Sequence, residues 1–169
     1  MIMKNMKILI FLHGTIIMHK NAKGRSREER VKQSLVREPS VLDYINYIPV
    51  GCAVNKLRKW EKQGAMIIYF SSHETPADVK KDKAVLKKYG FPTGRVVFRK
   101  DGKTYKYITE KILPDVLIED DCESIGGEKE MTITNVSPSI KKEIKLIVVK
   151  EFSGIDGLPD NLYQLLKGK

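Results

Sequence analysis

Uninterrupted apolar runs recur along the chain and are separated by stretches of mixed polarity. Runs of this kind, unlike alternating ones, are typical of strands that are buried on both faces of a parallel sheet. They lie at residues 7–12, 65–70, 95–98, 115–118 and 146–149. The pattern therefore predicts a mostly parallel sheet.

Helical patterns fill the intervals between these runs. Ala53, Leu57 and Trp60 recur at helical spacing with charged residues between them. Pro76 suits the first position of a second helix, which Gly90 ends. Further helices are predicted at residues 105–112 and 159–166. Alternating strands and helices form right-handed βαβ units, so we expect a three-layer α/β/α sandwich around a Rossmann-like sheet.

The stretch before Pro49 breaks this alternation. Residues 21–38 are polar and basic at first and then densely charged, which predicts an insertion followed by a short helix. Pro39 opens another helical turn. A length of 169 residues suits one domain, so we predict a single domain over 1–169 with an insertion at 18–50.

Polar and ionisable residues follow the ends of three predicted strands. In open α/β sheets, ligands bind beyond the carboxyl ends of the strands. We therefore expect these side chains to gather at one edge of the sheet. They are His13, Ser71, Ser72, His73, Glu74, Asp120 and Asp121.

In this order, the residues resemble the motifs of the haloacid dehalogenase (HAD) superfamily. That family opens with an apolar strand followed by Asp-x-Asp-Gly-Thr. Here Gly14 and Thr15 match, whereas Phe11 stands in the nucleophile's place and His13 in that of the general acid. The resemblance implies a divergent HAD-like protein that lacks both aspartates of the first motif.

The other HAD motifs extend the resemblance over nearly the whole chain. The second motif is a strand ending in a phosphoryl-binding serine or threonine, matched by Ser71. The fourth is an acidic pair that holds magnesium, matched by Asp120 and Asp121. Residues 18–50 fall where the family inserts its flap or small cap.

The third motif is a lysine that steadies the charged intermediate. Lys106 is the candidate, with Lys103 and Lys111 as alternatives. Lys106 and His13 are therefore the candidate catalytic residues, because an imidazole titrates near neutral pH and can act as acid or base. His13 can equally be a metal ligand, or its side chain can have only a packing role.

The first motif decides which chemistry is expected. HAD phosphatases form an aspartyl-phosphate, and phenylalanine at position 11 has no nucleophile and removes one magnesium ligand. The resemblance then implies a phosphorylated ligand bound with a divalent metal, without the ordinary covalent mechanism. The candidate substrate-binding residues are Gly14, Thr15, Ser71, Ser72 and His73.

Two of the histidines have plain structural interpretations. His73 either binds substrate or caps the helix that starts near Pro76, and we favour the cap. His19 is expected to be a solvated cap residue.

Adjacent carboxylates at positions 120 and 121 repel each other unless a cation or hydrogen-bond donors satisfy them. The metal is therefore expected at Asp120 and Asp121, with an acidic turn as the alternative. Magnesium is the expected ion, and manganese and zinc are the alternatives. A mixed set with His13 and His73 would instead hold zinc, manganese or iron and activate water directly.

The formal net charge is +10, which attracts polyanions such as phosphorylated small molecules and nucleic acid. The segment 20–37 is a nucleic-acid contact, an ordinary charged helix or a lid whose arginines reach a phosphate. A non-catalytic pseudoenzyme that binds protein or RNA is therefore the alternative function.

Cysteine usage and hydropathy bear on the compartment. Cys52 and Cys122 form no CxxC motif and are expected to be reduced thiols. The apolar run 8–12 is too short for a signal peptide, and no run approaches the ~18 residues of a membrane span. We expect a cytoplasmic protein without membrane contact.

Overall fold

A five-stranded parallel sheet forms the centre of the protein. The computed structural model describes residues 5–167, so both ends of the expected 1–169 domain lie outside the described part. The strand order is β5-β4-β1-β6-β7, and every neighbouring pair is parallel. The strands are β1 (Met6–Phe11), β4 (Ala65–Phe70), β5 (Arg95–Val97), β6 (Val116–Asp120) and β7 (Lys145–Val149). The predicted parallel sheet is confirmed.

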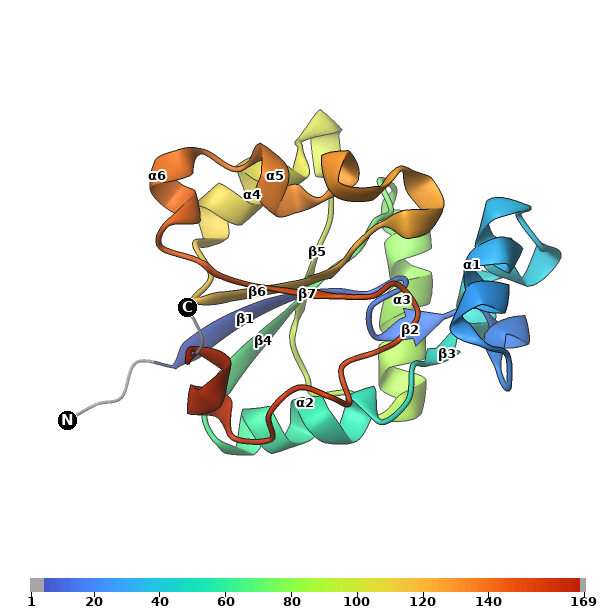
Figure 1. Cartoon of the computed structure of the whole chain (residues 1–169), viewed down its shortest axis with the longest axis horizontal. Helices are drawn as coiled ribbons and strands as arrows, with labels where there is room; N and C mark the ends of the chain where they lie inside the picture. Colours follow the sequence, from blue (N-terminus) through green and yellow to red (C-terminus); the bar gives the residue numbers. More distant parts are fainter. Residues whose placement is uncertain (1–4, 168–169) are drawn as a thin grey trace.

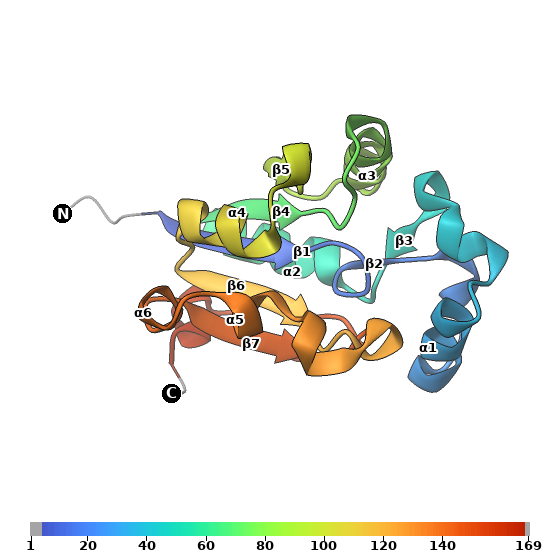
Figure 2. The ribbon, with the colours of Figure 1, turned by 90° about the horizontal axis from the view of Figure 1, so that it is seen from above.

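Helices cover both faces of this sheet, which confirms the three predicted layers (Figure 1). One face carries α2 (Ala53–Lys62) and α3 (Pro76–Tyr89). The other carries α4 (Tyr105–Ile112), α5 (Thr132–Asn135) and α6 (Pro138–Lys141). Figure 2 shows β4, β1, β6 and β7 side by side in this order. Among residues 5–167, no helix combines the length and the apolar character that crossing a membrane requires.

The central strand contributes to both cores because its side chains alternate between the two faces. Ile8 and Ile10 pack on the α2 side with Trp60. Leu9 packs on the α4 side with Ile112. All three strand residues are fully buried. The uninterrupted apolar run is thus what a strand buried on both faces requires.

Helix α3 begins and ends at the residues that its sequence indicates. The Thr75 side chain accepts a hydrogen bond from the Asp78 N–H, and Pro76 follows in the first turn. Gly90 ends the helix in the left-handed region at φ 69°. The cap role favoured for His73 is wrong, because Thr75 satisfies the helix start and leaves His73 to face the sheet edge.

Residues 18–50, called the insertion below, extend beyond the carboxyl ends of the sheet in both views (Figures 1 and 2). Strand β2 (Ile17–Met18) pairs antiparallel with β3 (Ile48–Pro49) and brings the ends of the insertion together. Between them, α1 (Arg27–Leu35) starts with a capping box. The insertion packs on its own small cluster of Met18, Ala22, Val31, Val50 and Phe152.

Two expectations about the insertion have different outcomes. The helical turn predicted after Pro39 is confirmed as two 3-10 turns, Pro39–Leu42 and Tyr44–Asn46. The expectation of a solvated His19 is wrong, because that side chain is buried and lies 2.9 Å from Gln33 Oε1. Further 3-10 turns are Lys20–Ala22, Lys100–Gly102, Glu123–Ile125 and Gly127–Glu130.

The helix predicted at 159–166 is wrong except for one 3-10 turn, Leu162–Leu165. Side chains of α2 bind backbone groups of this segment that a helix would pair internally. The Trp60 indole N–H donates to the Pro159 carbonyl at 2.9 Å, and Gln63 Oε1 accepts from the Leu162 N–H at 2.8 Å. Packing against α2 therefore overrides the local helical pattern.

Replacing Trp60 with alanine tests this packing. Trp60 is fully buried, so Trp60→Ala should lower the free energy of unfolding by about 3–5 kcal/mol in urea titrations. Lys62→Ala, at an exposed position of the same helix, should change it by less than about 0.5 kcal/mol. Similar losses in both variants would contradict the packing described for α2.

The ion pairs of Asp160 with α2 give a pH-dependent test. Hydrogen bonds from Lys56 and Lys59, at 2.5 and 2.6 Å, lower the pKa of Asp160 from 3.8 to about 2. A lowered carboxyl pKa contributes stability above the unfolded-state value, and this is lost as the pH falls toward about 2. Asp160→Asn should therefore lower Tm at neutral pH, and its difference from the native chain should vanish near pH 2. A difference that persists there would show that charge is not its cause.

Candidate functional site

A cavity of about 270 Å³ lies at the carboxyl edge of the sheet, under the insertion. Strand ends, the loops that follow them and the insertion all contribute to its wall. Among its described lining residues there is no lysine and no arginine, but there are four carboxylates: Glu119, Asp120, Glu130 and Glu151. A cavity of this charge stands in contrast to the net charge of +10.

The central strand ends in an aromatic cluster at this cavity. The Phe11 ring stacks on Phe70 with centroids 4.6 Å apart and meets Tyr105 edge-on at 5.3 Å. The Arg99 guanidinium lies 4.4 Å from the centroid of the Tyr105 ring. Apolar contact with Phe70 and Tyr105 therefore fixes Phe11, and its side chain offers no nucleophile.

Three carboxylates form an acidic centre where β6 and β7 end. One oxygen of each of Asp120, Asp121 and Glu151 lies within 4.8 Å of the others. Asp120 accepts hydrogen bonds from the Thr15 hydroxyl and the Cys122 N–H, both at 2.8 Å. Asp120, the last residue of β6, and Asp121 therefore lie beside the loop that follows β1.

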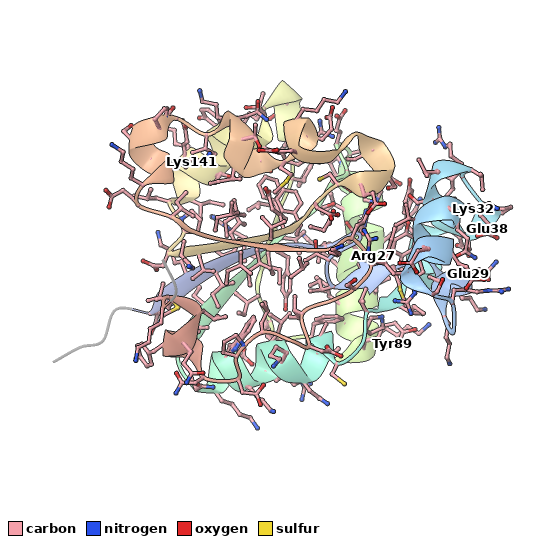
Figure 3. The ribbon with its side chains drawn as sticks, viewed as in Figure 1. Arg27, Glu29, Lys32, Glu38, Tyr89 and Lys141 are labelled. Atoms are coloured by element: carbon pink, nitrogen blue, oxygen red, sulfur yellow. The ribbon has the colours of Figure 1, made fainter. Side chains whose placement is uncertain are left out.

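Further donors hold the other two carboxylates. Glu151 accepts from the N–H and the hydroxyl of Ser124, both at 2.7 Å. The Glu151 N–H donates to Asp121 at 3.0 Å. Arg27 of α1 faces the sheet in Figure 3, with its Nη2 atom 3.8 Å from Asp121 Oδ2 and in contact with Glu123. The insertion therefore contributes one cation at the rim of the acidic centre.

Burial is the main cause of the raised pKa values in this centre. It raises the pKa of both Asp120 and Glu151, and the neighbouring carboxylates raise these pKa values further. Burial also raises the pKa of Glu119 to about 7, although N–H donors at Thr132 and Ile133 oppose this. Raised pKa values mean that the folded protein disfavours these negative charges unless a cation compensates them.

The acidic centre fits a divalent cation of the magnesium class. Carboxylate oxygens are the hard ligands that Mg²⁺ and Mn²⁺ prefer. The donors to Asp120 and Glu151 are neutral, and a carboxylate oxygen that accepts one hydrogen bond keeps a second lone pair. A bound cation would compensate the buried charge that neutral donors leave in place.

A second polar network lies at the ends of β1 and β4. His13 Nε2 is 2.8 Å from Asp82 Oδ1, and His13 Nδ1 is 2.8 Å from the Ser72 hydroxyl. The Ser71 hydroxyl donates to the other oxygen of Asp82 at 2.6 Å. Burial, with His13 beside it, lowers the pKa of His73 and so favours its neutral imidazole. Asp82, fully buried on α3, is the centre of this network.

The sheet edge brings together most of the side chains that the sequence singles out, but in two groups. His13, Ser71, Ser72 and His73 surround Asp82, whereas Gly14 and Thr15 lie against Asp120 and its neighbours. The mixed set expected for zinc is therefore divided. Its histidines approach Asp82, and its aspartates approach Glu151.

The lysine of the third motif does not join either group. Lys106 is exposed and absent from the cavity wall, while its neighbour Tyr105 lines the cavity. The inner face of α4 carries Tyr105, Ile108 and Ile112, which pack on the sheet. One residue along a helix is about 100° around its axis, so this packing directs Lys106 to solvent.

Sequence reasoning missed Asp82 and Glu151. Asp82 lies among Val79, Val85 and Leu86 on the buried face of α3, so a charged residue at an apolar position was the available signal. Glu151 comes two residues after β7, at the edge where the other candidates gather. Both residues are found only by asking which carboxylates occupy buried or strand-end positions.

Comparison with solved structures relates this site to known proteins. No family model matches the chain, and no curated protein matches it by sequence. The chain is similar to a class C acid phosphatase from Bacillus anthracis, a HAD-superfamily enzyme whose structure has tungstate bound. The TM-score is 0.53 at 13% identity, over 89% of this chain and 69% of the other. The fold is HAD-like.

A second structural comparison involves a larger protein. A chain in the structure of the Pnkp1/Rnl/Hen1 complex matches with a TM-score of 0.50 at 13% identity. The match covers 89% of the present chain and 48% of the other, so the present chain spans about half of its length. At this identity, both comparisons bear on the fold alone.

Gly14 tests the close packing of the acidic centre. Its φ is +80°, and a Cβ atom there would lie 3.1 Å from both Asp120 Oδ2 and Glu151 Cγ. Gly14→Ala should therefore lower the free energy of unfolding by about 2–4 kcal/mol, through backbone strain and crowding together. Gly102→Ala has a similar φ of +72° in open space and should cost only about 1–2 kcal/mol. Equal losses in urea titrations would show that the loop does not pack tightly on these carboxylates.

Proposed function

We propose that this HAD-like protein binds a phosphorylated ligand through a divalent cation held by Asp120, Asp121 and Glu151. The observation that carries the proposal is the charge of the cavity. Its described wall has four carboxylates and no lysine or arginine. Like charges repel strongly where water is scarce, so a phosphate dianion can enter only with a cation that neutralises the wall.

The structural comparisons support a phosphoester as the ligand class. The fold is shared with a protein named as an acid phosphatase, whose structure holds tungstate, a tetrahedral oxyanion. In such folds ligands bind beyond the carboxyl ends of the strands. The cavity of the present chain lies at this edge, next to the acidic centre.

Different residues of the chain would orient the metal ligands and contact the phosphorylated ligand. Thr15 and Ser124 orient Asp120 and Glu151 by hydrogen bonds and so keep their oxygens together. A divalent cation, when bound, supplies the positive charge that phosphoryl oxygens need. Ser72 lines the cavity, and its hydroxyl supplies a polar group for the rest of the ligand.

The proposed binding does not include ordinary HAD phosphatase chemistry. That chemistry needs a carboxylate nucleophile at the end of the central strand. Phe11 stands there, fixed by Phe70 and Tyr105. Lys106, the candidate to steady the intermediate, is exposed to solvent. We therefore propose ligand binding without an aspartyl-phosphate.

The net charge of +10 favours a second candidate, a non-catalytic module that binds nucleic acid. Because the described cavity wall has no lysine or arginine, such binding would use the outer surface. It would survive the loss of Asp120 and Asp121, and its affinity would fall steeply with salt.

Thermal unfolding with Mg²⁺ or Mn²⁺, with and without inorganic phosphate, tests the first proposal. The metal should raise Tm, because ligands that bind only the folded state stabilise it by about 2.7 kcal/mol at 100 times Kd. Phosphate should raise Tm further only when metal is present. Asp120→Asn/Asp121→Asn should lose both shifts, whereas Glu128→Gln, an exposed neighbour, should keep them.

Two results would overturn this proposal. A phosphate shift without metal would mean that protein donors alone hold the anion. The absence of any metal shift in the native chain would remove the acidic centre as a cation site. Salt-sensitive RNA binding that persists in the double variant would establish the second candidate instead.

A further inference from the structure

The network around Asp82 has a donor set of its own. One possible ligand atom from each of His13, His73 and Asp82 lies within 4.8 Å of the other two. The two histidines follow β1 and β4, and the aspartate comes from α3. None of these three residues belongs to the acidic centre of Asp120, Asp121 and Glu151.

One buried atom in this network has no hydrogen-bond partner among the described residues. His73 Nε2 is buried and forms no hydrogen bond within the described part of the chain. It lies 3.7 Å from Asp82 Oδ1, and the His73 side chain is only 10% exposed. Buried polar atoms in folded proteins are almost always paired, so an orphaned imidazole nitrogen aimed at a buried carboxylate needs a partner.

We propose that His13, His73 and Asp82 bind a transition-metal ion of the zinc class at a site separate from the acidic centre. Two imidazoles and one carboxylate are a donor set that such ions favour over magnesium. Tetrahedral zinc with bonds of about 2.0–2.1 Å places its ligand atoms roughly 3.3 Å apart. The distances from Asp82 to His13 and His73, 2.8 and 3.7 Å, lie on either side of this value.

Neighbouring hydroxyls already orient these ligands. Metal-bound histidines commonly use their second ring nitrogen for an outer hydrogen bond, and ligating carboxylates are held in the same way. His13 Nδ1 is 2.8 Å from the Ser72 hydroxyl. The Ser71 hydroxyl donates to Asp82 Oδ2 at 2.6 Å, which leaves Oδ1 toward the histidines. With Nε2 on the ion, the His13 Nδ1–H donates to Ser72.

The insertion shields this site from water. The Tyr44 ring lies against His73 with centroids 4.3 Å apart and stacks on His13 at 5.7 Å. Tyr47 also contacts the His13 ring, at 5.1 Å. An aromatic shell limits solvent access to a bound ion. His13 also lines the cavity, so the site adjoins the space proposed for the ligand.

Calorimetric titration of the chelator-treated 169-residue chain with Zn²⁺ tests the site. The Asp120→Asn/Asp121→Asn variant is used as the background, so that the acidic centre cannot contribute. One zinc ion should bind per chain. His73→Ala should lower the affinity by at least about tenfold, and Ser72→Ala by about 10- to 100-fold. Cys52→Ser, at an exposed thiol, should bind zinc as before.

Co²⁺ in place of Zn²⁺ gives a spectroscopic readout. Tetrahedral Co²⁺ with nitrogen and oxygen ligands should show visible absorption without a thiolate charge-transfer band. A thiolate band would place the ion at a cysteine and overturn the proposal. The same titrations are made with His73→Gln as well as His73→Ala. Circular dichroism without metal verifies that each variant is folded.

The outcomes separate this site from the proposed function. Zinc binding that survives in folded His73 variants, or no zinc binding by the native chain, overturns the His13–His73–Asp82 site. Zinc binding that is lost in the aspartate variant but kept when His73→Ala is made alone in the native chain assigns zinc to the acidic centre and also overturns the proposal. Magnesium-dependent phosphate binding is tested independently of the zinc site, because it depends on Asp120 and Asp121.

Discussion

Parallel pairing of β1 between β4 and β6 is the constraint on which the rest of the structure depends. The register sets Phe11 beside Phe70 and Ile10 beside Ile118, so the three strands end at one edge. The loops that follow them then meet by necessity. Burial of the strand on both faces fixes this register, because a slip of one residue would exchange its two sets of core contacts.

The meeting of strand ends concentrates negative charge in an otherwise basic protein. Asp120 and Glu151 are buried there, and burial raises the pKa of both carboxyls. Neutral donors from Thr15 and Ser124 hold these groups in place but bring no charge. The insertion adds Arg27 at the rim of the centre, and the described cavity wall has no lysine or arginine. This imbalance is why a cation is central to the proposed function.

Two clusters of different donor chemistry share the sheet edge. The oxygen-only cluster suits hard cations, whereas the cluster with His13 and His73 suits softer ions. They arise from different elements, since Asp120 ends β6 and Asp82 lies within α3. The aromatic end of β1 completes the edge with apolar contacts. Polar side chains thus gather at this edge of the sheet, although the central strand ends without a carboxylate.

The sequence by itself determined the parallel sheet, the helix over 105–112 and the set of strand-end residues, because hydrophobic periodicity and the carboxyl-edge rule act locally. It did not determine which side chains pair across the edge. In the sequence, Asp82 has the pattern of an ordinary helix residue, and only the packing of α3 against the strand ends places it among the polar side chains. Lys106 matches a catalytic motif, but in the folded chain Tyr105 lines the cavity and Lys106 does not. The C-terminal segment likewise forms only a 3-10 turn in place of the predicted helix, because it packs against α2. Contacts between residues far apart in sequence determine where these side chains and this segment lie. A local sequence pattern carries no information about such contacts.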